Sequence, residues 1–204
     1  MYRKNTASIN RVAQLALSAL LLCITLLASL PAPHAVHAQP IAPPSTCSRQ
    51  QASPSYIDGT SGGDGGDPFT DTGAGNAALT ISLPDTTRVR GVIIQSGNYV
   101  DGIQLVYILR GQTVSWGYHG GAGGDHHEFW LDSDEYITGI EGRSGAFVDS
   151  LIIHTNKRSS PQYGGDGGAN AYSYDVPPKF HVMGFWGRSG DYIDSIGIEY
   201  RQNC

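Results

Sequence analysis

Arg188-Ser-Gly-Asp-Tyr-Ile-Asp-Ser-Ile196 is a stretch of sequence that occurs in recognisable form three times. The other two copies are Gln95-Ser-Gly-Asn-Tyr-Val-Asp-Gly-Ile103 and Arg143-Ser-Gly-Ala-Phe-Val-Asp-Ser-Leu151. Each copy has a glycine followed four residues later by an aspartate, and the aspartates of successive copies are 48 and 45 residues apart. A period of this size indicates one supersecondary unit that is used three times.

A second motif repeats with the first. Gly62-Gly-Asp-Gly-Gly66, Gly120-Gly-Ala-Gly-Gly124 and Gly164-Gly-Asp-Gly-Gly168 share the pattern Gly-Gly-x-Gly-Gly. All 27 glycines follow residue 38, and there they are roughly twice as frequent as in an average protein. Glycine accepts positive φ and lets another group approach the backbone closely. Any function assigned to the chain must explain why both loops come in threes.

Residues 1–38 have the features of a secretory signal peptide. Three basic residues come first, an apolar run extends from Val12 to Leu30, and small residues precede a plausible cleavage site after Ala38. We therefore expect the protein to be secreted. A retained membrane anchor is the alternative, but Pro31 and Pro33 end the apolar run and no basic cluster follows, which favours cleavage over membrane insertion.

Charge excludes two classes of partner. Residues 1–38 contain three of the 13 basic residues and none of the 18 acidic residues, so the remaining chain has a formal charge of −8. An acidic chain without a basic stripe is a poor candidate for binding nucleic acid or anionic lipid.

Residues 39–54 form a Pro/Ser-rich N-terminal arm, and residues 55–204 form the expected domain. Cys23 is lost with the signal, which leaves Cys47 and Cys204 at opposite ends of the mature chain. In an oxidising compartment these two thiols most simply form a disulfide that ties the termini together. Two free or intermolecular thiols are the alternative.

The apolar pattern predicts an all-β domain. Short runs rich in β-branched and aromatic residues alternate with Gly, Asp, Asn and Pro, and no window has a helical stripe. The predicted strands are 89–94, 103–108, 136–140, 150–154, 180–185 and 196–200. Three strand, loop and strand units give approximate threefold symmetry, with Ile103, Leu151 and Ile196 pointing into a shared core.

With its paired loops, the chain resembles the jacalin-related lectins of the mannose-binding type, and most of all those members with three pairs of sugar-site loops. The resemblance covers about residues 55–201. It implies a β-prism I of three four-stranded antiparallel sheets. It also implies sugar binding without a metal or other cofactor, and no catalysis.

The resemblance also implies which residues bind sugar. In the family, the last glycine of each Gly-rich loop meets a Gly-x-x-x-Asp loop. The three implied sites are Gly66 with Gly190, Asp191, Tyr192 and Asp194; Gly124 with Gly97, Asn98, Tyr99 and Asp101; and Gly168 with Gly145, Ala146, Phe147 and Asp149. The third site departs from the pattern, since Phe147 replaces a tyrosine and Ala146 has no polar group.

These residue types suit a hexose. An ionised aspartate accepts hydrogen bonds from two adjacent hydroxyls, and such charge-assisted bonds are strong. Backbone N–H groups can donate to the same hydroxyls if the main chain comes close, which glycine permits. In the family, galactose preference accompanies a cleaved chain with a new N-terminal glycine. Residues 55–60 and a longer arm precede the first Gly-rich loop here, so mannose or glucose is expected.

Three other functions compete with sugar binding. A glycoside hydrolase would need paired carboxylates, and the candidates are Asp64, Asp125, Asp166, Asp191 and Glu128. A metal protein could use two clusters, His119, Asp125, His126 and His127 or Asp58, Asp64, Asp67 and Asp71, but neither matches a full ligand motif.

The third competitor is a β-prism that binds protein or serves a structural role without sugar affinity. Trp116, Trp130 and Trp186 are expected in the core or at the prism ends, and exposed tryptophans would favour this alternative. A homo-oligomer is compatible with the sequence.

Overall fold

The structure is a computed structural model that describes residues 55–73, 83–84 and 86–203. The signal peptide predicted at 1–38, the arm at 39–54, and both cysteines of the expected disulfide, Cys47 and Cys204, lie outside the described residues. Within the described ranges there is no helix of the length and apolar character needed to cross a membrane.

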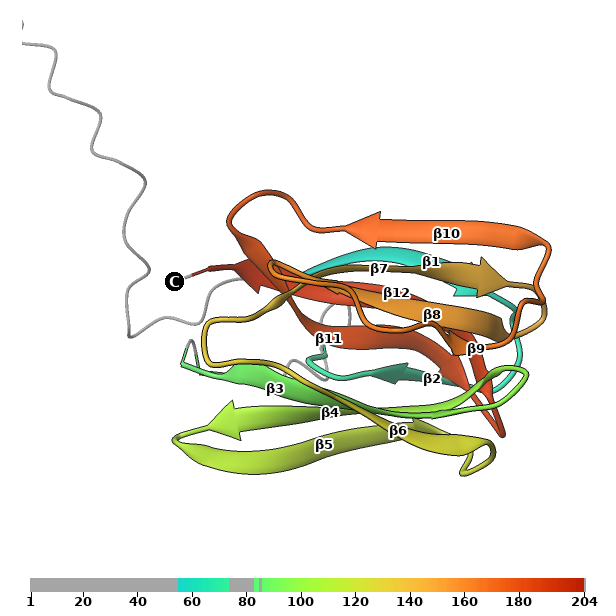
Figure 1. Ribbon diagram of the computed structural model, residues 1–204, viewed down its shortest axis with the longest axis horizontal. Coiled ribbons are helices and arrows are strands. Elements are labelled where there is room, and N and C mark those ends of the chain that lie inside the picture. Colours follow the sequence, from blue (N-terminus) through green and yellow to red (C-terminus); the bar gives the residue numbers. More distant parts are fainter. Residues whose placement is uncertain (1–54, 74–82, 85, 204) are drawn as a thin grey trace, which may run out of the picture. The chain divides into compact units, whose positions relative to one another are not determined.

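Twelve strands in the described part of the chain form three four-stranded antiparallel sheets (Figure 1). Sheet A runs in the order β1 (Tyr56–Gly62), β12 (Ile193–Gln202), β11 (Phe180–Ser189) and β2 (Asp67–Thr70). Sheet B runs in the order β5 (Gln112–Gly120), β4 (Val100–Leu109), β3 (Arg88–Ser96) and β6 (Asp125–Trp130). Sheet C runs in the order β10 (Asn170–Asp175), β7 (Ile137–Ser144), β8 (Val148–Thr155) and β9 (Tyr163–Gly164). This is the β-prism I that was predicted.

Every sheet has a central hairpin that comes from one copy of the repeat. The hairpins are β3–β4, β7–β8 and β11–β12, and each has two register shifts at equivalent places. The second shift falls at Gln95/Ser96, Arg143/Ser144 and Arg188/Ser189, where the strand enters the Gly-x-x-x-Asp loop. Because a bulge bends a strand and increases its twist, the repeated shift turns the three loops in the same way.

The core lies between the three sheets. Ile103, Leu151 and Ile196, the residues predicted to point inward after each aspartate, are all buried, which confirms that prediction. Among the described residues, Phe185 is the largest side chain that is fully buried. Burying a side chain of this size contributes about 1.5–3 kcal/mol.

Strands of the central hairpins were predicted from the sequence, whereas the outer strands were not. The outer strands are short or polar, as in Asp67-Pro-Phe-Thr70 and Asp125-His-His-Glu-Phe-Trp130. Edge strands commonly carry charged residues or proline because these discourage pairing with another sheet. Figure 1 also shows β1, from the beginning of the domain, beside β12 at its end, and the two strands pair in register Tyr56↔Tyr200.

Candidate functional site

The structure brings each predicted pair of loops together. A Cβ added at Gly190 would lie 3.7 Å from the Cα of Gly66, and the equivalent distances are 3.6 Å for Gly97 to Gly124 and 3.8 Å for Gly145 to Gly168. The last glycine of each Gly-rich loop has positive φ, of 61°, 70° and 77° in the order of the chain. Side-chain residues are strained there, so glycine is needed for the close approach. The role of these loops in sugar binding stays a prediction.

Backbone hydrogen bonds repeat at all three loop pairs. The second glycine of each Gly-rich loop donates to the carbonyl of the paired aspartate, from Gly63 to Asp194 and from Gly121 to Asp101 at 2.8 Å, and from Gly165 to Asp149 at 2.9 Å. Inside each Gly-x-x-x-Asp loop, the first glycine donates to the carbonyl two residues later at 2.9–3.0 Å. The three loop pairs therefore share one set of main-chain hydrogen bonds, to which side chains can add.

The three aspartates are only 5–7% exposed, and their carboxylates lie against the Gly-rich loops. A Cβ at Gly65, Gly123 or Gly167 would overlap Oδ1 of the paired aspartate. The Oδ2 atom of Asp101 is buried and has no hydrogen-bond partner among the described residues. A buried carboxylate oxygen without a partner is costly, so a hydrogen-bond donor that reached this atom would be stabilised.

Burial raises the pKa of two of these carboxyls. At Asp101, burial raises the pKa, and it outweighs the backbone N–H of Gly97, whose hydrogen bond lowers the pKa. At Asp194 burial again dominates, opposed by the N–H of Gly190 and by the positive charge of Arg188. Desolvation disfavours the ionised form, and a ligand that donates hydrogen bonds would favour it.

Arginine holds two of the Gly-rich loops. Arg188 donates from Nε to Gly65 O at 2.7 Å and from Nη2 to Gly66 O at 2.6 Å. Arg143 donates from Nε to Gly167 O and from Nη2 to Gly168 O, at 3.0 and 2.6 Å. We call each of these contacts an arginine latch.

The equivalent residue at the remaining site is Gln95. Its Nε2 atom lies 3.1 Å from His126 Nδ1, on the strand that pairs with β3. The sequence-based prediction gave these residues no role, although they begin the three copies of the repeat. A comparison of the first residue in each copy would have found the difference.

Loops from different sheets interlock at this end of the prism. A Cβ at Gly63 would overlap Ala146 O, one at Gly121 would overlap Asp191 O, and one at Gly165 would lie 2.7 Å from Asn98 O. Each Gly-rich loop thus contacts two Gly-x-x-x-Asp loops from two sheets.

Tyr99, Phe147 and Tyr192 also pack on one another, with ring centroids 4.9–5.4 Å apart. These half-buried rings therefore connect the three Gly-x-x-x-Asp loops to one another. This structural role is independent of any contact that the rings make with a ligand.

The carboxylates proposed for a hydrolase are all exposed, and Asp64, Asp166 and Asp191 lie on three separate loops. The pKa of Glu128 is lowered by hydrogen bonds from Trp130 and His126, which is opposite to the raised pKa that a general acid needs.

No group of three or more His, Cys, Asp or Glu side chains in the described ranges could hold a metal ion. His119 instead bonds the buried Asp71, with Nε2 2.9 Å from Oδ1, and its ring stacks on Phe69 at 4.0 Å. Asp71 Oδ2 also accepts the backbone N–H of Phe185 at 2.8 Å. This polar cluster joins sheets A and B and accounts for two of the candidate metal ligands.

The expectation that all three tryptophans pack in the core or at the prism ends is wrong for two of them. Trp116 is 39% exposed and Trp130 is 40% exposed. Trp130 Nε1 donates to Glu128 at 2.8 Å, and Arg90 lies 5.6 Å from its ring centroid. These polar partners hold the Trp130 ring at the surface, so its orientation does not depend on burial in the core. Trp186 is half-buried.

Comparison with known proteins gives one consistent family. The model of the jacalin-like lectin domain matches residues 58–199. The structure of Malaysian banana lectin is 28% identical with a TM-score of 0.60, and the match covers 73% of this chain and 99% of that one. No curated protein matches the chain.

Two further solved structures are similar. A mannose-binding jacalin-related lectin from Ananas comosus is 27% identical with a TM-score of 0.61, and the match covers 74% of this chain and 99% of the other. Artocarpin in complex with mannopentose is 25% identical with a TM-score of 0.60, with 72% of this chain and 98% of artocarpin covered.

Proposed function

Since the chain belongs to the family of jacalin-like lectin domains, we propose that it is a secreted, non-catalytic lectin for mannose- or glucose-type glycans with up to three binding sites. The observation that carries this proposal is the buried carboxylate of Asp101, whose Oδ1 lies against Gly123 and whose Oδ2 has no hydrogen-bond partner among the described residues. A carboxylate in such a position accepts a hydrogen bond from a ligand hydroxyl. Its surroundings repeat at Asp149 and Asp194.

Mannose is favoured over galactose for two reasons. The solved relatives include a mannose-binding lectin and a lectin bound to mannopentose. The first Gly-rich loop also continues directly from β1 (Tyr56–Gly62), so Gly66 is internal to the chain rather than a new terminus. A backbone N–H, not a charged amino group, is then the donor beside Asp194.

Affinity is expected to depend on valency. A single site of this kind binds a free sugar near the millimolar range, about −4 kcal/mol. Three sites on one domain raise the avidity for branched glycans by roughly 10² to 10⁴ where the spacing fits. Tight binding to mannose-rich surfaces should therefore accompany weak binding to monosaccharide, and equal affinity for both would contradict the proposal.

Calorimetric titration with a branched mannose oligosaccharide tests the function. We expect binding of this ligand to weaken stepwise with each of Asp101→Ala, Asp149→Ala and Asp194→Ala, because each removes one of up to three sites that the branches engage. Asp175→Ala is the matched control, because this exposed aspartate ends β10 outside the loops. Hydrolysis of an aryl glycoside should be undetectable.

Absence of heat with mannose, glucose and galactose ligands would remove the lectin proposal. A protein-binding β-prism would then lead, and exposed Trp116 and Trp130 would be the first surface to test. A comparable loss of affinity in the Asp175→Ala control would show that the loop aspartates are not special.

A further inference from the structure

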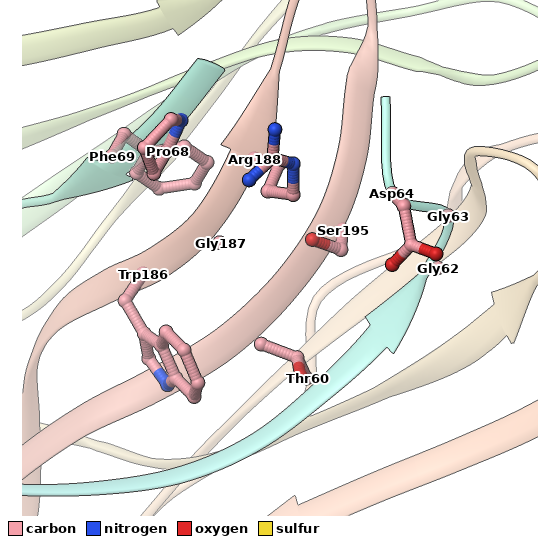
Figure 2. A pocket seen from close by; sticks show the side chains of 10 residues that line it. All are labelled: Thr60, Gly62, Gly63, Asp64, Pro68, Phe69, Trp186, Gly187, Arg188 and Ser195. Atoms are coloured by element: carbon pink, nitrogen blue, oxygen red, sulfur yellow. The ribbon is translucent and has the colours of Figure 1, made fainter. Parts of the chain in front are cut away.

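A pocket of about 330 Å³ lies on sheet A beside the Asp194 loops (Figure 2). Its lining includes Thr60, Asp64, Pro68, Trp186, Arg188 and Ser195. Neither Asp194 nor the loop 190–192 is among the lining residues, so the pocket is separate from the predicted sugar site. Its volume falls in the range of small-molecule sites, about 300–1,000 Å³. We call it the Trp186 pocket.

Trp186 is held flat against the sheet. Its Nε1 atom donates to Asp58 O at 3.2 Å. It pairs across strands with Gly197, where an added Cβ would lie only 2.5 Å from Nε1. A side chain at position 197 would lift the indole away, so glycine there allows the ring to rest on β12. The fixed ring offers apolar surface without the entropic cost of ordering a mobile side chain.

Polar groups surround this apolar floor. Figure 2 shows the Ser195 and Thr60 hydroxyls, the Asp64 carboxylate and the Arg188 guanidinium around the same space as the indole. A pyranose ring has an apolar face of C–H groups and a rim of hydroxyls that donate and accept. The combination of a flat aromatic ring with hydroxyl, carboxylate and guanidinium groups therefore fits a hexose better than a purely apolar ligand.

Arg188 connects the pocket with the Asp194 site. While it lines the pocket, it also donates to the carbonyls of Gly65 and Gly66. Gly66 in turn lies against Asp194. The two sites thus share one arginine and one Gly-rich loop, and a glycan held at Asp194 can extend into the pocket.

The other two sheets do not have a tryptophan at the position of Trp186. Two residues before the first residue of each repeat copy, the side chains differ between the sheets. They are Trp186 before Arg188, Glu141 before Arg143 and Ile93 before Gln95. Their neighbours on the hairpin partner are Gly197, Ile152 and Gln104. Only sheet A combines tryptophan with an opposing glycine at these three positions.

We propose that the Trp186 pocket is a second sugar-binding subsite, in which a neighbouring hexose unit of a glycan bound at Asp194 packs on the indole ring. The proposal rests on the proposed lectin function and adds a specificity for oligosaccharides at one of the three sites. It gives the Asp194 site an extended recognition surface that is built on Trp186.

The test isolates the Asp194 site in the Asp101→Ala/Asp149→Ala background. Affinity is measured by calorimetry for methyl α-mannoside and for mannobioses and a branched mannotriose. Trp186→Ala should lower the affinity for the best oligosaccharide about 3- to 10-fold more than the affinity for the monosaccharide. Glu141→Ala, at the equivalent position of sheet C, is the matched control and should leave this ratio unchanged.

Fluorescence gives an independent measurement that keeps Trp186 in place. The chain has three tryptophans, so Trp116→Phe/Trp130→Phe in the same background leaves Trp186 as the sole indole. Its emission should shift with the oligosaccharide and stay constant with methyl α-mannoside.

An equal loss of affinity for both ligands, or no loss together with constant emission, overturns the subsite and leaves the lectin function standing. If the background variant that keeps Asp194 binds no sugar, the subsite is overturned. If the unmodified chain also binds no sugar, the lectin function is overturned as well.

Discussion

Two of the three Gly-rich loops are closed by an arginine latch, whereas loop 120–124 belongs to the site that begins with Gln95. Arg188 and Arg143 each bond two loop carbonyls, and Gln95 instead contacts His126. The main-chain hydrogen bonds are the same at all three sites. The difference shows that a repeated backbone conformation does not make the sites equivalent, because side chains decide how firmly each loop is held.

A latched loop is expected to bind sugar more tightly. The guanidinium fork fixes two carbonyls at once, so less conformational entropy is lost when a ligand orders the loop. Arg188 has a further effect, because its charge opposes the rise of the Asp194 pKa. At Asp149 the latch is present, but Ala146 and Phe147 remove polar groups from the loop. We therefore expect the Asp194 site to be the strongest of the three.

The largest expected effect comes from removing the charge of one aspartate. In a background that retains only the Asp194 site, Asp194→Asn should weaken methyl α-mannoside binding by about 100-fold, because charge-assisted hydrogen bonds become neutral ones and an amide N–H replaces an acceptor. Calorimetry measures the loss. Asp175→Asn, at an exposed aspartate that ends β10 outside the loops, should leave affinity unchanged. Comparable losses for both would show that the buried carboxylate is not the central acceptor.

Loss of the latch should have the next largest effect. Arg188→Gln in the same single-site background should weaken binding about 10-fold, or about 1.4 kcal/mol, because the loop must be ordered on binding. Arg88→Gln is the control, since Arg88 begins β3 and donates to Ser133 O far from the loops along the strand. Unchanged affinity for Arg188→Gln would mean that the backbone bonds alone hold the loop.

The reverse exchange should produce a smaller gain. In the Asp149→Ala/Asp194→Ala background, Gln95→Arg should strengthen binding at the Asp101 site by about 3-fold if the new guanidinium reaches the carbonyls of Gly123 and Gly124. Titration with methyl α-mannoside gives the affinity. Gln95→Lys adds the charge without the fork, and an equal gain for the two variants would assign the effect to charge rather than to loop closure.

The smallest effect concerns pH. Binding needs an ionised carboxylate, so affinity is full above the raised pKa of Asp194 and is lost as the pH falls through it, at a pH above the ordinary value of 3.8. Arg188→Gln removes a charge that lowers this pKa, and the acid loss of binding should move to higher pH. Affinity measured between pH 3.5 and 7 at constant ionic strength tests this sign. A shift to lower pH would contradict the assigned role of Arg188.

Local sequence was enough to predict the six central strands and the positions of the loops. Short runs of β-branched residues indicate buried strands from a few neighbouring positions. The Gly-x-x-x-Asp motif can be recognised in all three copies by comparing the sequence with itself. The outer strands were not predicted because Pro68 and the polar run from Asp125 to Glu128 mask a strand signal. The exposed Trp116 and Trp130 were misplaced because composition carries no information on which face of a sheet a residue occupies.

By itself, the sequence determined that one unit is used three times and that a Gly-rich loop and a Gly-x-x-x-Asp loop both repeat with it. Tertiary structure alone decided which loops interlock, how the rings of Tyr99, Phe147 and Tyr192 meet, and that Trp186 rests on Gly197 beside Arg188. The physical reason is distance along the chain. Contacts such as Gly65 with Arg188, which are 123 residues apart, depend on sheet closure and register, and no local pattern encodes them.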